Sequence, residues 1–118
     1  MIIPTLGDSD EFRRCILSIA ACNPNTIIVV TPKKNVNRLQ KLCESLSLFH
    51  VNVLGAPKAN KRLQMIQGLK AVQTAITVFA DDDVFWPTTF LTYMLAPFED
   101  PGTGAVGGYT WYWPIFST

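Results

Sequence analysis

Four short apolar runs, each followed by a segment with a different polar pattern, organise the chain. The runs predict strands at residues 1–4, 27–30, 51–54 and 76–80. The second run is apolar at every position, which is typical of a strand buried on both faces of a parallel sheet. The segments between the runs carry apolar residues at helical spacing and predict helices in the ranges 12–20, 36–46 and 63–72.

Strands that alternate with helices favour β-α-β units with right-handed crossovers. The expected fold class is therefore α/β, with a Rossmann-like, mostly parallel sheet and flanking helices, amounting to half of a doubly wound fold. The sequence Asp8-Ser9-Asp10-Glu11 predicts an N-cap and an acidic first turn for the first helix. Residues 55–57 predict the turn that leads into the third helix.

Beyond the fourth strand the pattern weakens. A fourth helix is expected to start at Pro87 and to end at Pro97, with its apolar positions at Phe90, Leu91, Met94 and Leu95. Residues 102–108 predict a glycine-rich loop around a weak strand. The tail 109–118 is aromatic and uncharged, and it is too short and too interrupted by proline to span a bilayer.

Composition places the chain among globular proteins. Its 118 residues are 48% hydrophobic and 16% charged, enough for one domain with a core. No run approaches the ~20 apolar residues of a membrane span, and no leader precedes the first helix, so a soluble chain on the cytoplasmic side is expected. The three cysteines lack a CxxC spacing and are expected to be reduced, mostly in the core.

Charge is divided unequally along the sequence. All ten lysines and arginines lie in residues 1–70 with four acids, whereas residues 71–118 hold five acids and no base. A phosphorylated ligand between a basic and a metal-bearing acidic segment would use both halves. A basic group of four residues is instead expected to be the wet face of a helix: Lys33, Lys34, Arg38 and Lys41. Nucleic acid is not expected as a partner, because no contiguous basic stripe exists.

Three consecutive carboxylates, Asp81, Asp82 and Asp83, follow the fourth predicted strand directly. Ligand sites of open α/β sheets lie at the carboxyl ends of strands. Adjacent anions with no base nearby repel one another, and a divalent cation carrying a phosphorylated ligand would resolve the repulsion. The alternative is a solvated acidic turn or a helix N-cap ahead of Pro87.

Four segments in this order resemble the inverting family 2 glycosyltransferases, and within them the polysaccharide synthases related to hyaluronan and type 1 capsule synthases. The matching segments cover residues 2 to about 107 and are Ile2-Ile3-Pro4-Thr5, Ile27-Ile28-Val29-Val30-Thr31, Asn60-Lys61-Arg62 and Ala80-Asp81-Asp82-Asp83-Val84-Phe85-Trp86-Pro87. The resemblance implies a GT-A-like fold that binds a nucleotide-diphosphate sugar, in particular a UDP-sugar, with Mg²⁺ or Mn²⁺.

The resemblance also implies roles for single residues. Asp81 and Asp83 match a D-x-D motif that binds the sugar nucleotide and its metal, with Asp83 the main metal ligand. Asp82 counts with them in the nucleotide-sugar site, although a side chain between two others on a strand is expected to point away and be solvated.

The other implied contacts surround the nucleotide. Pro4 and Thr5 would lie beneath the uridine, although Pro4 is equally explained as a strand terminator. Thr31 stands where many family members carry an aspartate that contacts the base or ribose. Lys61 and Arg62 match a basic position that contacts the nucleotide, and a helix start favours anions independently; the alternative is an exposed helix face.

Two motifs of the resembled synthases have no counterpart: the T-E-D-like carboxylate that deprotonates the acceptor and the Q-x-x-R-W motif. Glu99 and Asp100 lie too early in the chain and are expected to be solvated. We therefore expect residues 1–108 to be a truncated donor-binding half, inactive in transfer by itself, with full-length relatives in a membrane. The tail 109–118 departs from the pattern, and Trp111 and Trp113 are candidates for self-association.

Two other functions fit parts of the sequence. A receiver-type phosphate or Mg²⁺ switch would use Asp8 and Asp10, but Leu54-Gly55 and the lack of any lysine after Lys70 disfavour it. A non-catalytic binder of sugar nucleotides would share the fold of the donor half.

Overall fold

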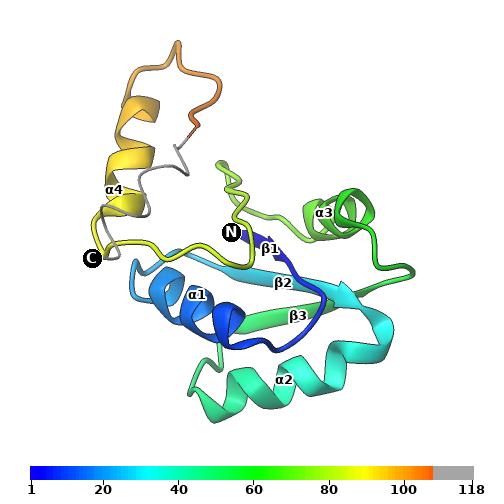
Figure 1. The fold of residues 1–118 in the computed structure, drawn as a ribbon. Coiled ribbons are helices and arrows are strands. Elements are labelled where there is room, and N and C mark those ends of the chain that lie inside the picture. Colours follow the sequence, from blue (N-terminus) through cyan, green and yellow to red (C-terminus); the bar gives the residue numbers. More distant parts are fainter. Residues whose placement is uncertain (108–118) are drawn as a thin grey trace.

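The computed structural model describes residues 1–107, so the predictions for the tail and for Trp111 and Trp113 lie outside the described residues. Three parallel strands form the sheet in the order β1-β2-β3, and helices cover both of its faces (Figure 1). The strands are β1 (Ile2–Pro4), β2 (Ile27–Pro32) and β3 (Val51–Ala56). This arrangement confirms the predicted α/β class and corresponds to part of a GT-A, Rossmann-like fold.

β2 is the central strand, and all six of its residues are buried. Its register places Val30 opposite Pro4 of β1 and opposite Leu54 of β3. β3 extends two residues beyond its predicted end, through Gly55 and Ala56, which the sequence placed in a turn. These residues pair with Thr31 and Pro32, so the longer β2 extends its neighbour.

The predicted fourth strand is reduced to a single bridge, between Phe79 and Ile2. The Ile2 amide donates to the Val78 carbonyl at 2.8 Å, and the Ala80 amide donates to the Ile2 carbonyl at 3.0 Å. The prediction of a regular strand is wrong because β1 offers only three residues for pairing. The segment 76–80 nevertheless lies beside β1, on the edge opposite β2.

Two helices cover one face of the sheet, namely α1 (Asp10–Ala20) and α2 (Val36–Ser45), which follows the short 3-10 turn η1 (Lys33–Asn35). Their apolar side chains form the larger core with one face of β1 and β2, around Phe12, Leu39 and Val29. The Ser9 side chain caps α1 by accepting from the Phe12 amide at 3.2 Å, and Asp10 and Glu11 make the predicted acidic first turn.

α3 (Lys61–Leu69) covers the opposite face, above a smaller cluster that contains Ile2 and Val30. The spacing of its apolar residues predicted this helix, but three of them are substantially exposed: Leu63 (40%), Ile66 (42%) and Leu69 (45%). Gln64 and Gly68 are buried against the sheet instead. α3 packs so closely on the sheet that only a glycine fits at position 68.

The fourth helix is shorter than expected. α4 (Phe90–Leu95) begins three residues after Pro87, and the 3-10 turn η2 (Ala96–Glu99) contains Pro97. Its predicted start is wrong because the preceding backbone is held elsewhere: Trp86 is buried, and its amide donates to Ser18 Oγ at 3.1 Å. The Trp86 and Phe90 rings then pack with centroids 4.8 Å apart.

The predictions for the cysteines and for several exposed side chains are confirmed. Cys15 and Cys43 are buried, Cys22 is half-buried, and all three are free thiols. The basic group at the start of α2 is exposed, as are Glu99 and Asp100. No helix within residues 1–107 has the length and apolar character needed to cross a membrane.

Gly68 is the position where we expect the packing of α3 to be most sensitive. A Cβ there would lie 2.8 Å from a methyl group of Ile2 and 3.2 Å from one of Val30. Gly68→Val should lower the free energy of unfolding by about 1–3 kcal/mol, because both neighbours are enclosed and β-branched. Urea denaturation measures this change. Gly104→Val is the matched control, since a Cβ at Gly104 meets nothing within 4 Å; equal losses in the two variants would contradict the packing argument.

Candidate functional site

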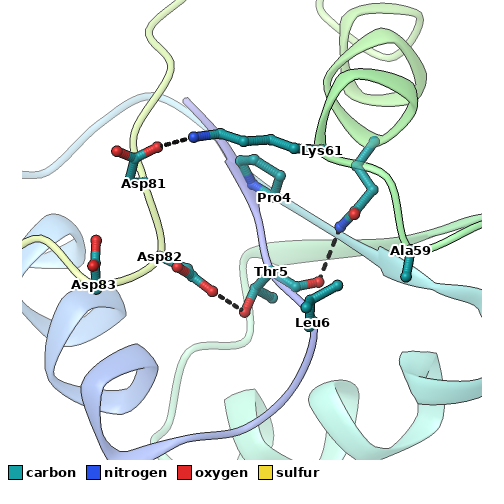
Figure 2. A pocket seen from close by; sticks show the side chains of 9 residues that line it. Pro4, Thr5, Leu6, Ala59, Lys61, Asp81, Asp82 and Asp83 are labelled. Atoms are coloured by element: carbon teal, nitrogen blue, oxygen red, sulfur yellow. Dashed lines mark hydrogen bonds and ion pairs between the residues drawn. The ribbon is translucent and has the colours of Figure 1, made fainter.

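A cleft of about 350 Å³ opens where the end of β1, residues 81–83 and the start of α3 meet. Side chains from all three lie around it (Figure 2). The lining residues are Pro4, Thr5, Leu6, Ala59, Lys61, Gln64, Asp81, Asp82 and Asp83. The cleft lies at the carboxyl ends of β1 and of the neighbouring segment 76–80. The strand order reverses here, because β2 and β3 lie on one side of β1 and segment 76–80 lies on the other. Open α/β folds bind ligands at this position.

The three aspartates have three different surroundings. Asp81 forms an ion pair with Lys61, and Asp82 Oδ2 accepts from Thr5 Oγ1 at 2.8 Å. Asp83 is exposed and makes no hydrogen bond or ion pair with any residue in the described part of the chain. Two of the three carboxylates are thus held by the protein, and the third is open to a ligand.

Asp82 corrects a sequence prediction. It was expected to point away from its neighbours, yet it lines the same cleft as they do. The strand-like alternation ends after Ala80, and residues 82 and 83 lie in a turn. A turn has no two-residue alternation, so all three carboxylates reach one cleft.

The Asp81–Lys61 pair lies at the surface, with side-chain exposures of 48% and 63%. The hydrogen bond from Lys61 to Asp81 raises the pKa of the lysine, and the other two aspartates act in the same direction. Exposed pairs of this kind contribute only about 0–1 kcal/mol to stability. Lys61 therefore places a positive charge beside three negative ones and can exchange partners at low cost.

Thr5 connects the end of β1 to residues 81–83, called the acidic turn below. It is 3% exposed, and its hydroxyl lies 3.2 Å from the Gly7 carbonyl as well as 2.8 Å from Asp82. A single hydroxyl proton is shared between these two acceptors, and the carboxylate is the nearer one. The contact spans 77 positions in the sequence.

The larger core holds the acidic turn from behind through α1. The Cys15 thiol donates to the Asp81 carbonyl at 3.4 Å, and Ser18 Oγ donates to the Cys15 carbonyl at 2.8 Å while accepting from the Trp86 amide. Burial, with a smaller repulsion from the aspartates, raises the pKa of Cys15 to about 12. This cysteine is therefore a protonated structural donor and not a nucleophile.

Two residues implied by the sequence are not brought to the cleft. Thr31 is fully buried, and its hydroxyl has no hydrogen-bond partner among the described residues. Arg62 is exposed on α3 but does not line the cleft, whereas its neighbour Lys61 does.

Sequence reasoning missed three lining residues: Leu6, Ala59 and Gln64. Gln64 carried a usable signal, because it lies one helical turn after Lys61, and residues three apart on a helix share a face. The neighbouring apolar residues dominate the pattern of this helix and obscure that signal.

The residues present offer a partial site for a hard cation. Within residues 1–107 no group of three or more histidine, cysteine or carboxylate side chains converges as a complete metal site. Asp81 and Asp83 provide carboxylate oxygens, the donors that Mg²⁺ and Mn²⁺ prefer, and Mg²⁺ commonly completes its shell with ligand phosphate and water. The donor set therefore fits such an ion only together with a phosphorylated ligand.

Comparison with known protein families identifies the chain. The model of the glycosyltransferase-like family 2 matches residues 1–114. The chain belongs to this family. The assignment is supported by a "Type 2 glycosyltransferase" of Gibberella zeae, which is 48% identical over 108 residues, covering 91% of this chain and 20% of that protein.

Two further fungal proteins agree with the family 2 assignment. A "Type 2 glycosyltransferase" of Pyricularia oryzae is 42% identical, and the match covers 91% of this chain and 22% of that protein. An "NDP-glycosyltransferase ltbB" of Aspergillus luteorubrus is 38% identical over 112 residues, or 92% of this chain and 27% of that protein. The family 2 chain thus spans about a quarter or less of the curated relatives it matches. No solved structure matches it significantly.

The Thr5–Asp82 hydrogen bond of this family 2 chain can be tested by a double-mutant cycle. Thr5→Val and Asp82→Ala should show a coupling of about 1 kcal/mol or more in the free energy of unfolding, because a hydrogen bond to a charged group is the shared interaction. Thermal or urea unfolding of the two single variants and the double variant provides the measurement. Thr5→Val paired with Asp83→Ala is the control and should be additive, and a coupling below ~0.3 kcal/mol in the first cycle would show that the contact does not support the turn.

Proposed function

We propose that the cleft binds a nucleotide-diphosphate sugar, specifically a UDP-sugar, together with Mg²⁺ or Mn²⁺, as the donor side of an inverting glycosyltransferase of the polysaccharide synthase type. The observation that carries the proposal is that Asp81, Asp82 and Asp83 lie together beside Lys61, at the point where the strand order reverses. Ligand sites in proteins typically enclose about 300–1,000 Å³, and this cleft lies at the lower end of that range.

Charge in the cleft suits a diphosphate bridged by a cation. Lys61 can contact phosphate oxygen directly, whereas the aspartates would repel a diphosphate that arrived without a metal. Asp83, with no partner among the described residues, and Asp81 would hold the ion. A divalent cation bound there supplies charge neutralisation for a departing nucleoside diphosphate. The protein contributes the position of the carboxylates, fixed from behind by Cys15 and Ser18.

The comparisons support this proposal at the level of the family. The relatives are named as glycosyltransferases, one of them as an NDP-glycosyltransferase. We assign donor binding to residues 1–108 and expect acceptor activation to reside in the remainder of a longer protein, which would make this chain a non-catalytic donor half when alone. A receiver-type switch is less well supported, because Asp8 and Asp10 do not line the cleft.

UDP binding should depend on a divalent cation, and Asp83→Ala should abolish that dependence. Titration calorimetry of UDP into the chain, with Mn²⁺ and with chelator, should show at least about tenfold tighter binding with the metal for the unmodified chain. In the Asp83→Ala variant the two affinities should become equal, because the carboxylate and the diphosphate share one ion in our proposal.

Asp8→Ala is the matched control, since it removes a carboxylate outside the cleft and should leave the metal effect intact. Equal UDP affinity of the unmodified chain in Mn²⁺ and in chelator would remove the metal from the proposal. Loss of the metal effect in Asp8→Ala, with Asp83→Ala unaffected, would instead support the receiver-type alternative.

The two adjacent basic residues should separate in their effects. Lys61→Ala should weaken UDP binding about tenfold, as expected for the loss of a charged hydrogen bond, whereas Arg62→Ala should change it less than about twofold. Both variants should melt near the temperature of the unmodified chain, because both side chains are exposed. If Arg62→Ala weakened binding as much as Lys61→Ala, the nucleotide would lie on a different face of α3.

A further inference from the structure

Gln64 is a buried amide whose orientation is fixed by two backbone carbonyls. It is 2% exposed, and its Nε2 donates to the Val30 carbonyl at 2.8 Å and to the Thr5 carbonyl at 3.0 Å. Both partners can only accept hydrogen bonds, so the nitrogen must face the sheet and the amide cannot be flipped.

This orientation leaves Oε1 of Gln64 as an acceptor without a donor. It accepts no hydrogen bond from any residue in 1–107. Among the described side chains only Thr31 Oγ1 is both fully enclosed and unpaired, so the unpaired Gln64 oxygen keeps some exposure. Gln64 nevertheless lines the cleft. The small exposed part of this side chain therefore offers a fixed carbonyl oxygen to whatever occupies the cleft.

The position of this oxygen restricts the group it can meet. Phosphate oxygens are acceptors and cannot pair with it. The cleft is charged on the side of the aspartates and is lined by Leu6 and Ala59 on the other side, which suits a planar ring (Figure 2). Thr31, considered from the sequence as a base contact, is fully enclosed and outside the cleft.

We propose that Gln64 determines base specificity, with its Oε1 accepting a hydrogen bond from the imide N–H of uracil. This inference rests on the proposed function, because it assumes that a nucleoside diphosphate occupies the cleft. Uracil presents a donor at N3, whereas cytosine presents an acceptor there, which would face the Gln64 oxygen with no proton between them. A site built around a fixed acceptor rejects such an analogue, since the acceptor is then desolvated and left unpaired.

The test compares four ligands on the 118-residue chain: UDP, CDP, UDP methylated at N3, and 2′-deoxy-UDP. The unmodified chain should bind UDP at least about tenfold more tightly than CDP or the N3-methylated ligand. Gln64→Met retains the size of the side chain without the amide. In this variant UDP binding should weaken, and UDP and CDP should bind with about equal affinity. Gln67→Met, on the same helix but outside the cleft, is the control and should keep the full preference.

The ratio of the two affinities separates recognition from support of the fold. A purely structural role for Gln64 would weaken UDP and CDP equally and leave their ratio unchanged, which would overturn the inference. Equal binding of UDP and CDP by the unmodified chain would also overturn it, even if Gln64→Met failed to fold. If Gln64→Met lost a preference for UDP over 2′-deoxy-UDP but kept the preference for UDP over CDP, the oxygen would contact the ribose and the inference would be wrong. No UDP binding at all by the unmodified chain would reject the proposed function itself.

Discussion

Pairing on both edges of β1 is the interaction on which the rest of the structure depends. One edge pairs with β2, and the other holds the segment 76–80 through the two hydrogen bonds of Ile2. The chain first builds outward from β1 to β3 and then returns to the opposite side of β1. This return places Thr5 next to Asp82, although the two residues are 77 positions apart in the sequence. The cleft lies at this reversal of strand order, between the end of β1, the start of α3 and residues 81–83, where open α/β sheets bind their ligands.

The cleft is supported by polar contacts from both layers of helices. On one side the Cys15 thiol donates to the acidic turn, and Ser18 holds the backbone of Trp86. On the other side the Gln64 amide joins Thr5, directly after β1, to Val30 of β2. Each of these groups is buried and uses its donors on backbone carbonyls, so the wall of the cleft is fixed before any ligand arrives. Binding to a prepared wall avoids the entropy of ordering it.

The sequence predicted the architecture well where the pattern was strong. The apolar run of β2, the Ser9 cap of α1 and the position of the three aspartates after a strand-like segment all follow from local chemistry. It failed where tertiary packing overrode the local pattern. α3 turns Gln64 and Gly68 toward the sheet, because the Gln64 amide donates to two backbone carbonyls and the close approach to Ile2 leaves no room for a side chain at position 68. The leucines of α3 remain exposed. The side-chain direction of Asp82 could not be predicted either, because its partner Thr5 is distant in the sequence.

The acidic turn shows how adjacent carboxylates can be tolerated and still serve a ligand. Asp82 is held by a half-buried hydrogen bond to Thr5, which fixes the backbone of the turn. Asp81 is held by an exposed ion pair of little net strength, so Lys61 can leave it for a phosphate at a cost of about 1 kcal/mol or less. Asp83 has no protein partner among residues 1–107 to give up. Under the proposed function, binding would therefore disturb only the weakest of these contacts, while the contact that maintains the shape of the turn would remain in place.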